Sequence, residues 1–152
     1  MIESYEVAHT APDFELYGLG LAHKHVPELQ RYSGLSRRPI FVPSVGNFRQ
    51  GMLVSVPLHL DLLPGAPTGQ DIQNALEAHY HGAALVRVAS TEEVAALNGR
   101  LDALALNGTD KLELYVLANE EERQAVLVAR LDNLGKGAAG AAVQNLKLML
   151  GL

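Results

Sequence analysis

The stretch GMLVSVPLHLDL, residues 51–62, indicates the fold more clearly than any other part of the chain. Every second side chain from Met52 to Leu60 is apolar, a two-residue period that is typical of a strand with one buried face. Pro57 lies within this stretch and has no N–H to donate to a neighbouring strand. We therefore predict a strand that lies at the edge of a sheet or is bulged at Pro57.

Further strand-like runs lie on both sides of this stretch. We expect strands at residues 13–19, 38–45, 84–89, 100–106, 111–117 and 125–131, with a charged, solvated hairpin tip at 118–124. Proline and capping residues predict a short helix from Pro27 to Gly34, and a second helix that Thr68 and Asp71 cap and Gly82 ends. Together these elements predict an α+β fold with a mostly antiparallel sheet.

The last expected element is a helix over residues 136–150 that ends at Gly151. Its apolar residues recur at helical spacing on one side, which we expect to face the sheet: Ala139, Ala142, Val143, Leu146, Met149 and Leu150. The opposite side is also uncharged and contains Gly137 and Gly140, although glycine inside a helix costs about 1 kcal/mol relative to alanine. These glycines can simply mark the helix start. We favour a helix that packs against partners on two sides, one of which lies outside this chain.

Composition limits the classes of protein that fit. The 152 residues are 48% hydrophobic, which suffices for one compact domain. A net charge of −5 argues against a nucleic-acid surface, and no apolar run approaches the roughly 20 residues of a membrane span. The first residues lack the basic and apolar regions of a signal peptide, so we expect a soluble cytoplasmic protein. With no cysteine, the sequence offers neither a disulfide nor a thiol nucleophile.

The stretch LAHKHVPEL, residues 21–29, places two histidines two positions apart, ahead of a proline and a glutamate. In an extended segment such residues point the same way, so His23 and His25 can reach one site together. An imidazole can donate or accept a proton near neutral pH, which suits acid–base catalysis. A polar strand end or half of a metal site would show the same spacing. We expect no metal, because no third ligand of the right type lies nearby in sequence.

Two longer motifs link this chain to a known family. AHKHVPELQ, residues 22–30, resembles the His-x-His-x-Pro-Glu segment of N-acetyl-gamma-glutamyl-phosphate reductases, the NADPH-dependent enzymes of arginine biosynthesis. LDNLGKGAAGAAVQNLKLMLGL, residues 131–152, is similar to that family's closing segment, while PSVGNFRQGMLVSVPL and LNGTDKLELYV fall between the two in the family's order. The resemblance covers nearly the whole chain and is closer to the family's shorter variant.

The resemblance implies a domain layout. Family members have a Rossmann NADP-binding domain that ends in a catalytic cysteine. A substrate-binding and dimerisation domain follows, like the C-terminal domain of glyceraldehyde-3-phosphate dehydrogenase, with a mixed sheet and helices on one face. This chain would begin after the cysteine, with Met1 as an internal methionine. Residues 1–135 would form the substrate-binding and dimerisation domain, and residues 136–152 a terminal helix that packs on the Rossmann domain.

The resemblance also implies roles for individual residues. His23, His25 and Glu28 would be catalytic, with Glu28 orienting an imidazole. The other implied roles are substrate binding by Arg49 or Gln50 and by Thr109, and cofactor binding by Lys136, Gly137, Gly140 and Asn145. A surface arginine, a tight turn at residues 107–110 and close helix packing would explain these residues nearly as well.

Other positions depart from the family's pattern or match no motif. Val26 and Ser44 stand where the family carries threonine and histidine, so the helix start at Val26 needs other partners and no role passes to Ser44. The remaining histidines are expected at the surface or at the edge of the core: His9, His59, His79 and His81.

The implied activity is the NADPH-dependent reduction of N-acetyl-glutamyl 5-phosphate, a small acyl phosphate, to the 5-semialdehyde and phosphate, by a homodimer or homotetramer. This chain alone would be inactive, because it has no cysteine. Two other functions stay open. One is a non-catalytic oligomerisation or ligand-binding domain of the same fold, and the other is the related reductase of lysine biosynthesis, which acts on a carrier-linked substrate.

Overall fold

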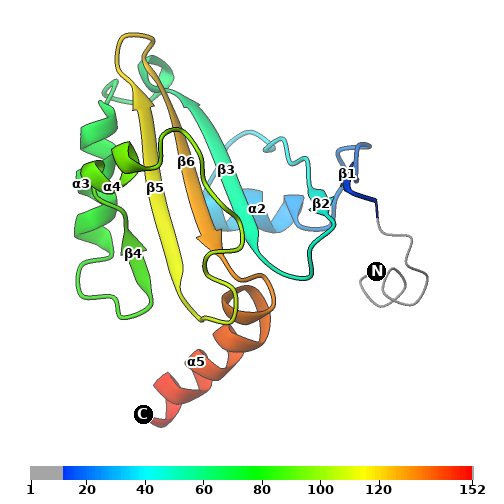
Figure 1. The fold of residues 1–152 in the computed structure, drawn as a ribbon. Coiled ribbons are helices and arrows are strands. Elements are labelled where there is room, and N and C mark those ends of the chain that lie inside the picture. The colour runs from blue at the N-terminus through cyan, green and yellow to red at the C-terminus, as the bar shows by residue number, and fades with distance from the viewer. Residues whose placement is uncertain (1–11, 152) are drawn as a thin grey trace. The chain divides into compact units, whose positions relative to one another are not determined.

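The structure is a computed structural model that describes residues 12–151 and divides the chain into two compact units, with the boundary between Arg49 and Gln50. Figure 1 shows the elements of both units. The expectations for Met1, His9 and Leu152 lie outside the described residues. Because the structure does not determine how the two units are placed relative to one another, each is described by itself.

The described part of the first unit, residues 12–49, contains one helix and one small sheet. Strands β1 (Phe14–Leu16) and β2 (Ser44–Gly46) pair antiparallel, so only the first part of the strand predicted at 13–19 and the last part of the one at 38–45 form. Helix α2 (Val26–Ser33) ends at Gly34 as predicted, in a left-handed conformation with φ of 70°. His25 precedes α2 and makes no side-chain capping bond, which agrees with the departure noted at Val26.

The second unit is built on a four-stranded sheet in the order β3-β6-β5-β4. Strands β3 (Met52–His59), β6 (Gln124–Leu131) and β5 (Leu112–Asn119) pair antiparallel, and β4 (Val86–Val88) pairs parallel with β5. Strand β3 lies at the edge, with all eight residues in register with β6, so the prediction drawn from Pro57 is confirmed without a bulge. The α+β class and the mixed, mostly antiparallel sheet are also confirmed.

Helices lie on both faces of this sheet rather than on one. Helix α3 (Gly69–His79) starts against the Ala118 side chain, whereas Val94 of helix α4 (Thr91–Ala96) packs against the core cluster formed by Ala89, Tyr115 and Val128. Side chains alternate along a strand, so Tyr115 and Ala118 point to opposite faces of β5. Right-handed crossovers explain this arrangement. The chain crosses from β3 to the far edge at β4 through α3 and returns to β5 through α4, and reversing direction changes the face that is covered.

Two segments around α4 differ from the sequence predictions. The stretch 100–106 is wrong as a strand, because it is an irregular segment from which Leu101 packs against the cluster that contains Tyr115. Helix α4 was not predicted, although Ser90 and Glu93 form a complete capping box at its start. The capping box that was predicted at Thr68 and Asp71 is present at α3, but α3 ends at His79, before Gly82.

The hairpin tip between β5 and β6 is exposed as predicted, at every residue of 118–124 except the half-buried Arg123, and two of its side chains also contact the connector before α3. A Glu120 carboxylate oxygen accepts a hydrogen bond from the Gly69 N–H at the start of α3, over 2.6 Å. The Arg123 guanidinium donates to the carbonyl oxygens of Ala66 and Pro67, at 2.7 and 2.9 Å. These contacts fasten the tip to the connector before α3, and a 3₁₀ turn, η1 (Leu60–Leu62), lies at the start of that connector.

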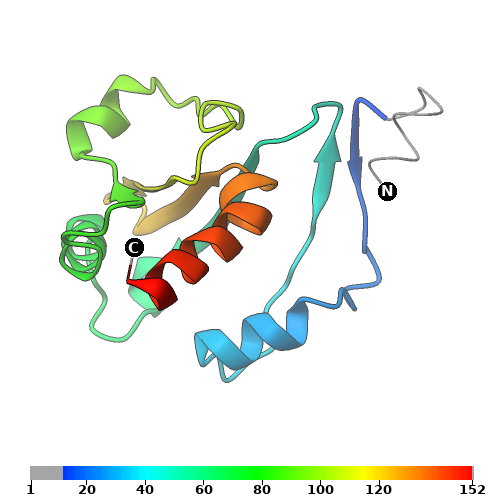
Figure 2. The same cartoon turned by 90° about the horizontal axis from the view of Figure 1, so that it is seen from below.

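The tail forms a π-helical turn, η2 (Gly135–Ala139), followed by α5 (Gly140–Leu150), which Gly151 ends as predicted. Helix α5 leaves the lower end of the sheet (Figure 1), and seen from below it lies in front of the strands (Figure 2). The predicted orientation of its sides is wrong. Gly140 is buried, and the stripe that was expected to face the sheet is exposed, with Met149 at 83%. Among residues 12–151, no helix combines the length and hydropathy that a membrane crossing needs.

Candidate functional site

The two histidines of the first unit lie side by side. Their ring centroids are 4.8 Å apart and the ring planes are inclined by 69°. An extended segment was predicted here, but the segment is not extended, because His25 already has the right-handed helical conformation that leads into α2. A turn, and not the two-residue period of a strand, therefore brings the two imidazoles together.

Aromatic side chains surround His23. The Phe41 and Tyr17 rings lie 5.1 and 5.9 Å from the His23 ring, measured between centroids. The backbone N–H of His25 donates to Nδ1 of His23 over 3.3 Å. A neutral His23 ring that accepts at Nδ1 carries its proton on Nε2, so that nitrogen is a hydrogen-bond donor. His23 is half-buried and His25 is exposed.

Glu28 does not contact either imidazole through a hydrogen bond. Among the residues that the structure describes, its carboxylate has no hydrogen-bond donor, and it is exposed on the first turn of α2. The orienting role implied for Glu28 thus stays a prediction. Of the three residues in the implied catalytic set, the described part of the first unit places only His23 and His25 side by side.

The alternatives left open at residues 49 and 50 differ in their surroundings. The Gln50 side-chain NH₂ donates to Oδ2 of Asp132 over 2.7 Å, and the Gln50 backbone carbonyl accepts from Nδ2 of Asn107 over 3.0 Å. Arg49 is exposed, and its guanidinium makes no ion pair with any described residue. Gln50 is therefore occupied inside the second unit, whereas Arg49 keeps its donors available for an anion.

The turn at residues 107–110 has a structural explanation. Oγ1 of Thr109 donates to the Leu106 carbonyl over 2.7 Å, and Gly108 has a φ of +75°, which favours glycine. The Gly108 N–H donates to Oδ2 of Asp132 over 2.7 Å. The Thr109 hydroxyl thus closes its own turn, and its predicted role in substrate binding is untested.

The four tail residues with implied cofactor roles have unlike surroundings. Nζ of Lys136 donates to Oε1 of Gln144 over 2.6 Å. Gly137 and Asn145 are exposed, and no described residue hydrogen-bonds the Asn145 amide. Gly140 is buried against its own domain, because a Cβ there would lie 1.7 Å from Oδ1 of Asp110. Close internal packing therefore accounts for Gly140. The exposed Gly137 donates its N–H to the Asp132 carbonyl, and the exposed Asn145 offers a side-chain amide that no described residue bonds.

Asp132 is the main residue that the sequence reasoning missed. It directly follows β6, is 1% exposed, and accepts from the backbone N–H groups of Leu134 and Gly135 as well as from Gln50 and Gly108. Burial raises the pKa of Asp132, but these four hydrogen bonds outweigh it and lower the pKa. The available signal was an aspartate between a strand and a helix start, which is typical of a capping residue.

A polar network on the sheet was also not predicted. Glu113 on β5 accepts from Tyr115, Arg87 and Arg130. Burial raises the pKa of Glu113, but these hydrogen bonds lower it to about 2, and burial together with the bond to Glu113 raises the pKa of Tyr115 to about 12.

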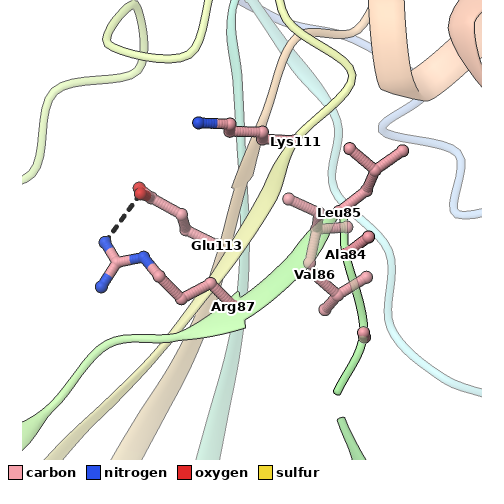
Figure 3. A pocket seen from close by; sticks show the side chains of 8 residues that line it. Ala84, Leu85, Val86, Arg87, Lys111 and Glu113 are labelled. Carbon is pink, nitrogen blue, oxygen red and sulfur yellow. Dashed lines mark hydrogen bonds and ion pairs between the residues drawn. The ribbon is translucent and has the colours of Figure 1, made fainter. Parts of the chain in front are cut away.

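The Glu113 network borders a shallow pocket of 270 Å³ beside β4 and β5, which Figure 3 shows together with Lys111. The Arg87 guanidinium there already contacts Glu93 at 2.6 Å and Glu113 at 2.7 Å. Arg87 is thus neutralised by protein carboxylates, and the pocket offers no free guanidinium to an anion. Within residues 12–151, no three acidic or histidine side chains gather as metal ligands would.

Comparison with known proteins identifies the family. Residues 1–133 match the family described as semialdehyde dehydrogenase, dimerisation domain. The chain is 54% identical over 144 residues to N-acetyl-gamma-glutamyl-phosphate reductase 2 of Pseudomonas putida, which covers 95% of this chain and 46% of that protein. It is 50% identical over 150 residues to N-acetyl-gamma-glutamyl-phosphate reductase of Burkholderia ambifaria, covering 99% of this chain and 47% of the relative.

A third relative, N-acetyl-gamma-glutamyl-phosphate reductase of Brucella ovis, is 56% identical over 136 residues, which make up 90% of this chain and 44% of that protein. The chain thus spans slightly less than half the length of the curated relatives it matches. The resemblance stated from the end motifs is confirmed, and the chain belongs to the semialdehyde dehydrogenase dimerisation-domain family, with N-acetyl-gamma-glutamyl-phosphate reductases among its relatives.

Proposed function

We propose that this chain is the substrate-binding and dimerisation part of an NADPH-dependent N-acetyl-gamma-glutamyl-phosphate reductase. The whole enzyme would convert N-acetyl-glutamyl 5-phosphate into the 5-semialdehyde and phosphate, in arginine biosynthesis in the cytoplasm. The observation that carries the proposal is the pair of adjacent imidazoles at His23 and His25, in a chain that is 54% identical to such a reductase.

The reaction requires a thiolate, which attacks the acyl carbon as the bond to phosphate breaks, and NADPH supplies the hydride that reduces the resulting thioester. The sequence has no cysteine, so the thiol must come from a different part of the enzyme, and we expect the chain alone to be inactive. What these residues contribute is the handling of protons and of the negative charge on oxygen.

The two histidines would divide this work. His23 accepts at Nδ1 from the His25 backbone, which leaves the Nε2–H group to donate to the acyl oxygen as negative charge develops there. His25 is exposed and has both ring nitrogens available, so it suits the acid–base role at the sulfur. Glu28, on the first turn of α2, would orient the His25 ring once substrate is bound, a contact that tightens only in the complex.

Substrate and cofactor contacts would come from exposed donors. Arg49 is preferred over Gln50 for the carboxylate or phosphate of the substrate, because a free guanidinium binds such groups in bidentate fashion. Thr109 would contribute from the turn at residues 107–110 of the second unit. The surroundings of Gly137 and Asn145 fit a cofactor, since an exposed amide can pair with the nicotinamide carboxamide, whereas Lys136 and Gly140 would act through the packing of the helix.

The proposed domain layout assigns residues 136–152 to a helix that packs on the NADP-binding domain, and residues 1–135 to substrate binding and dimerisation. The exposed apolar side of α5 supports the first assignment, because Leu146, Leu148 and Met149 would lose water on docking. Homo-oligomerisation, as a dimer or tetramer, is supported by the apolar side chains that β3 exposes, Met52, Val54 and Val56 among them.

The proposal is tested in the complete protein that joins this chain to its dinucleotide domain, by following NADP reduction with N-acetyl-glutamate 5-semialdehyde and phosphate. We expect His25→Asn to lower kcat by about 10²- to 10⁴-fold and to change its pH profile. His23→Asn should lower kcat by about 10²- to 10³-fold with the pH profile kept, as expected for loss of an oxyanion donor.

His81→Asn, at an exposed histidine of the second unit, is the matched control and should leave the rate unchanged. A complete wild-type protein that is folded but inactive on this substrate would contradict the proposal. Activity on a carrier-linked acyl phosphate instead would favour the lysine-biosynthesis relative, and unchanged rates in both histidine variants would favour a non-catalytic domain.

A further inference from the structure

Asp132 lies where three separate segments meet. Its Oδ1 accepts from the N–H groups of Leu134 and Gly135, at 2.8 and 3.1 Å, at the start of the tail. Its Oδ2 accepts from Gln50, just before β3, and from Gly108, in the turn before β5, each at 2.7 Å. One buried carboxylate therefore joins the beginning of the tail to two segments that lie 82 and 24 residues away in sequence.

The neighbouring residue repeats one of these links. Oδ1 of Asn133 accepts from the Gly51 N–H over 2.8 Å, and the Asp132 carbonyl accepts from the Gly137 N–H over 2.9 Å. Gly51 has a φ of +115° and lies against the Ala103 carbonyl, so this part of the chain has little freedom to move away. Hydrogen bonds to Asp132 and Asn133, the two residues that follow β6, thus hold the start of the tail in place.

Beyond this point the tail has few contacts with its own domain. Gly135 lies against the Thr109 carbonyl, where a Cβ would be only 2.7 Å from the oxygen, and Gly140 lies against Asp110. After Gly140 the apolar side chains of α5 are exposed, with Leu148 at 68%. The direction of α5 is therefore set at its first turns, by the contacts around Asp132 and by the two glycines.

The chemistry of the site calls for an ionised carboxylate. All four donors are N–H groups, and a carboxylate has two oxygens that can each accept two of them. Asparagine would turn an NH₂ group toward two N–H donors and leave them without an acceptor. Among the described residues, no lysine or arginine forms an ion pair with Asp132, so neutral N–H dipoles alone hold its charge.

We propose that Asp132 is a positioning residue, which sets the direction in which α5 leaves the domain. Resting on the proposed function, this role would hold Gly137 and Asn145 at the nicotinamide end of the cofactor. Asp132 itself is buried, so it would act through the placement of α5 and not by touching substrate or cofactor.

The first experiment uses the chain by itself and does not depend on the proposed function. Because the sequence has no cysteine, Leu148→Cys and Glu121→Cys can carry two spin labels on α5 and on the β5–β6 tip. Double electron–electron resonance should give one narrow distance distribution. Asp132→Asn should broaden that distribution, and Asp61→Asn, an exposed aspartate on η1, should leave it narrow. A narrow, unshifted distribution in Asp132→Asn overturns the proposal.

Circular dichroism shows whether Asp132→Asn folds. If it does not, Gln50→Met takes its place, because it removes one donor of four and keeps the carboxylate. A distribution broader than that of the wild type then supports the proposal, and one identical to it overturns the proposal.

The second experiment uses the complete enzyme. In Asp132→Asn the misplaced helix α5 should lower kcat/KM for NADPH by about 10²-fold, in line with the cost of small misplacements. KM for the acyl phosphate should stay unchanged. Equal effects on both substrates would indicate general destabilisation and overturn the positioning role. If the wild-type enzyme does not reduce the acyl phosphate, the proposed function fails, while the distance measurement still decides the role of Asp132.

Discussion

The side-chain amide of Gln50 donates to the buried carboxylate of Asp132 over 2.7 Å, and so joins a position two residues before β3 to the residue directly after β6. Strands β3 and β6 are paired along their full length, so the bond closes the end of a ladder that is already in register. It fixes the point where the tail begins.

Removing this bond should weaken the domain. We expect Gln50→Met to lower the free energy of unfolding by about 1.5–3 kcal/mol, the usual value for a hydrogen bond to a charged group. Urea unfolding of the chain, followed by circular dichroism, measures the change. Arg49→Met is the matched control, because Arg49 is adjacent, exposed and of similar length, and should change stability by less than about 0.5 kcal/mol.

The glycines of the tail should respond differently to alanine. In Gly140→Ala the new Cβ would lie 1.7 Å from Asp110 Oδ1 and 2.8 Å from the Gly135 carbonyl, so we expect a loss of about 1–3 kcal/mol from overpacking. In Gly137→Ala the nearest atoms are 3.5 Å away, and alanine should be neutral or stabilising by up to about 1 kcal/mol. Thermal unfolding of both variants checks the contrast, and equal losses would contradict it.

Acid should destabilise the domain partly through Glu113. Its pKa is lowered from 4.5 to about 2, because hydrogen bonds from Tyr115, Arg87 and Arg130 outweigh the effect of burial. The unfolded chain therefore binds the proton first, and the stability that Glu113 contributes above pH 4.5 is lost as the pH falls toward 2. We expect Glu113→Gln to reduce the loss of stability over this range. Glu122→Gln, at the exposed hairpin tip, should keep the wild-type dependence.

The exposed side of α5 should make the isolated chain associate. Met149 is 83% exposed, and each apolar side chain of this size left in water forfeits about 1.5–3 kcal/mol. We expect Met149→Lys to lower the apparent mass in analytical ultracentrifugation. Asn145→Lys adds the same charge to an exposed position of the same helix without removing an apolar group, and should not. A wild-type chain that stays monomeric at all concentrations would contradict this prediction.

The sequence predicted those elements whose local signals agree with their tertiary surroundings. Pro57 marked β3 as an edge strand, because a missing N–H is tolerated where no second neighbour needs it. Thr68 and Asp71 marked the start of α3, because a capping box is formed by residues close in sequence. The same signal at Ser90 and Glu93 was available and was missed.

The errors arise where a local pattern has two physical explanations. The largely apolar run 100–106 resembles a strand, but a segment that covers a sheet face also turns apolar side chains inward, as Leu101 does. In the tail, the apolar stripe predicted the wrong contact side, because the close approach to the domain is made by Gly140. The link between Gln50 and Asp132 spans 82 residues, and no local pattern carries it.

Pro57 has a consequence for how copies of this chain meet. Strand β3 offers an open edge flanked by apolar side chains, which is the usual template for endless strand-by-strand growth into fibrils. A proline on that edge interrupts the row of donors that an incoming strand would need. Growth by strand addition is therefore disfavoured at this edge, even though apolar side chains of β3 are exposed there.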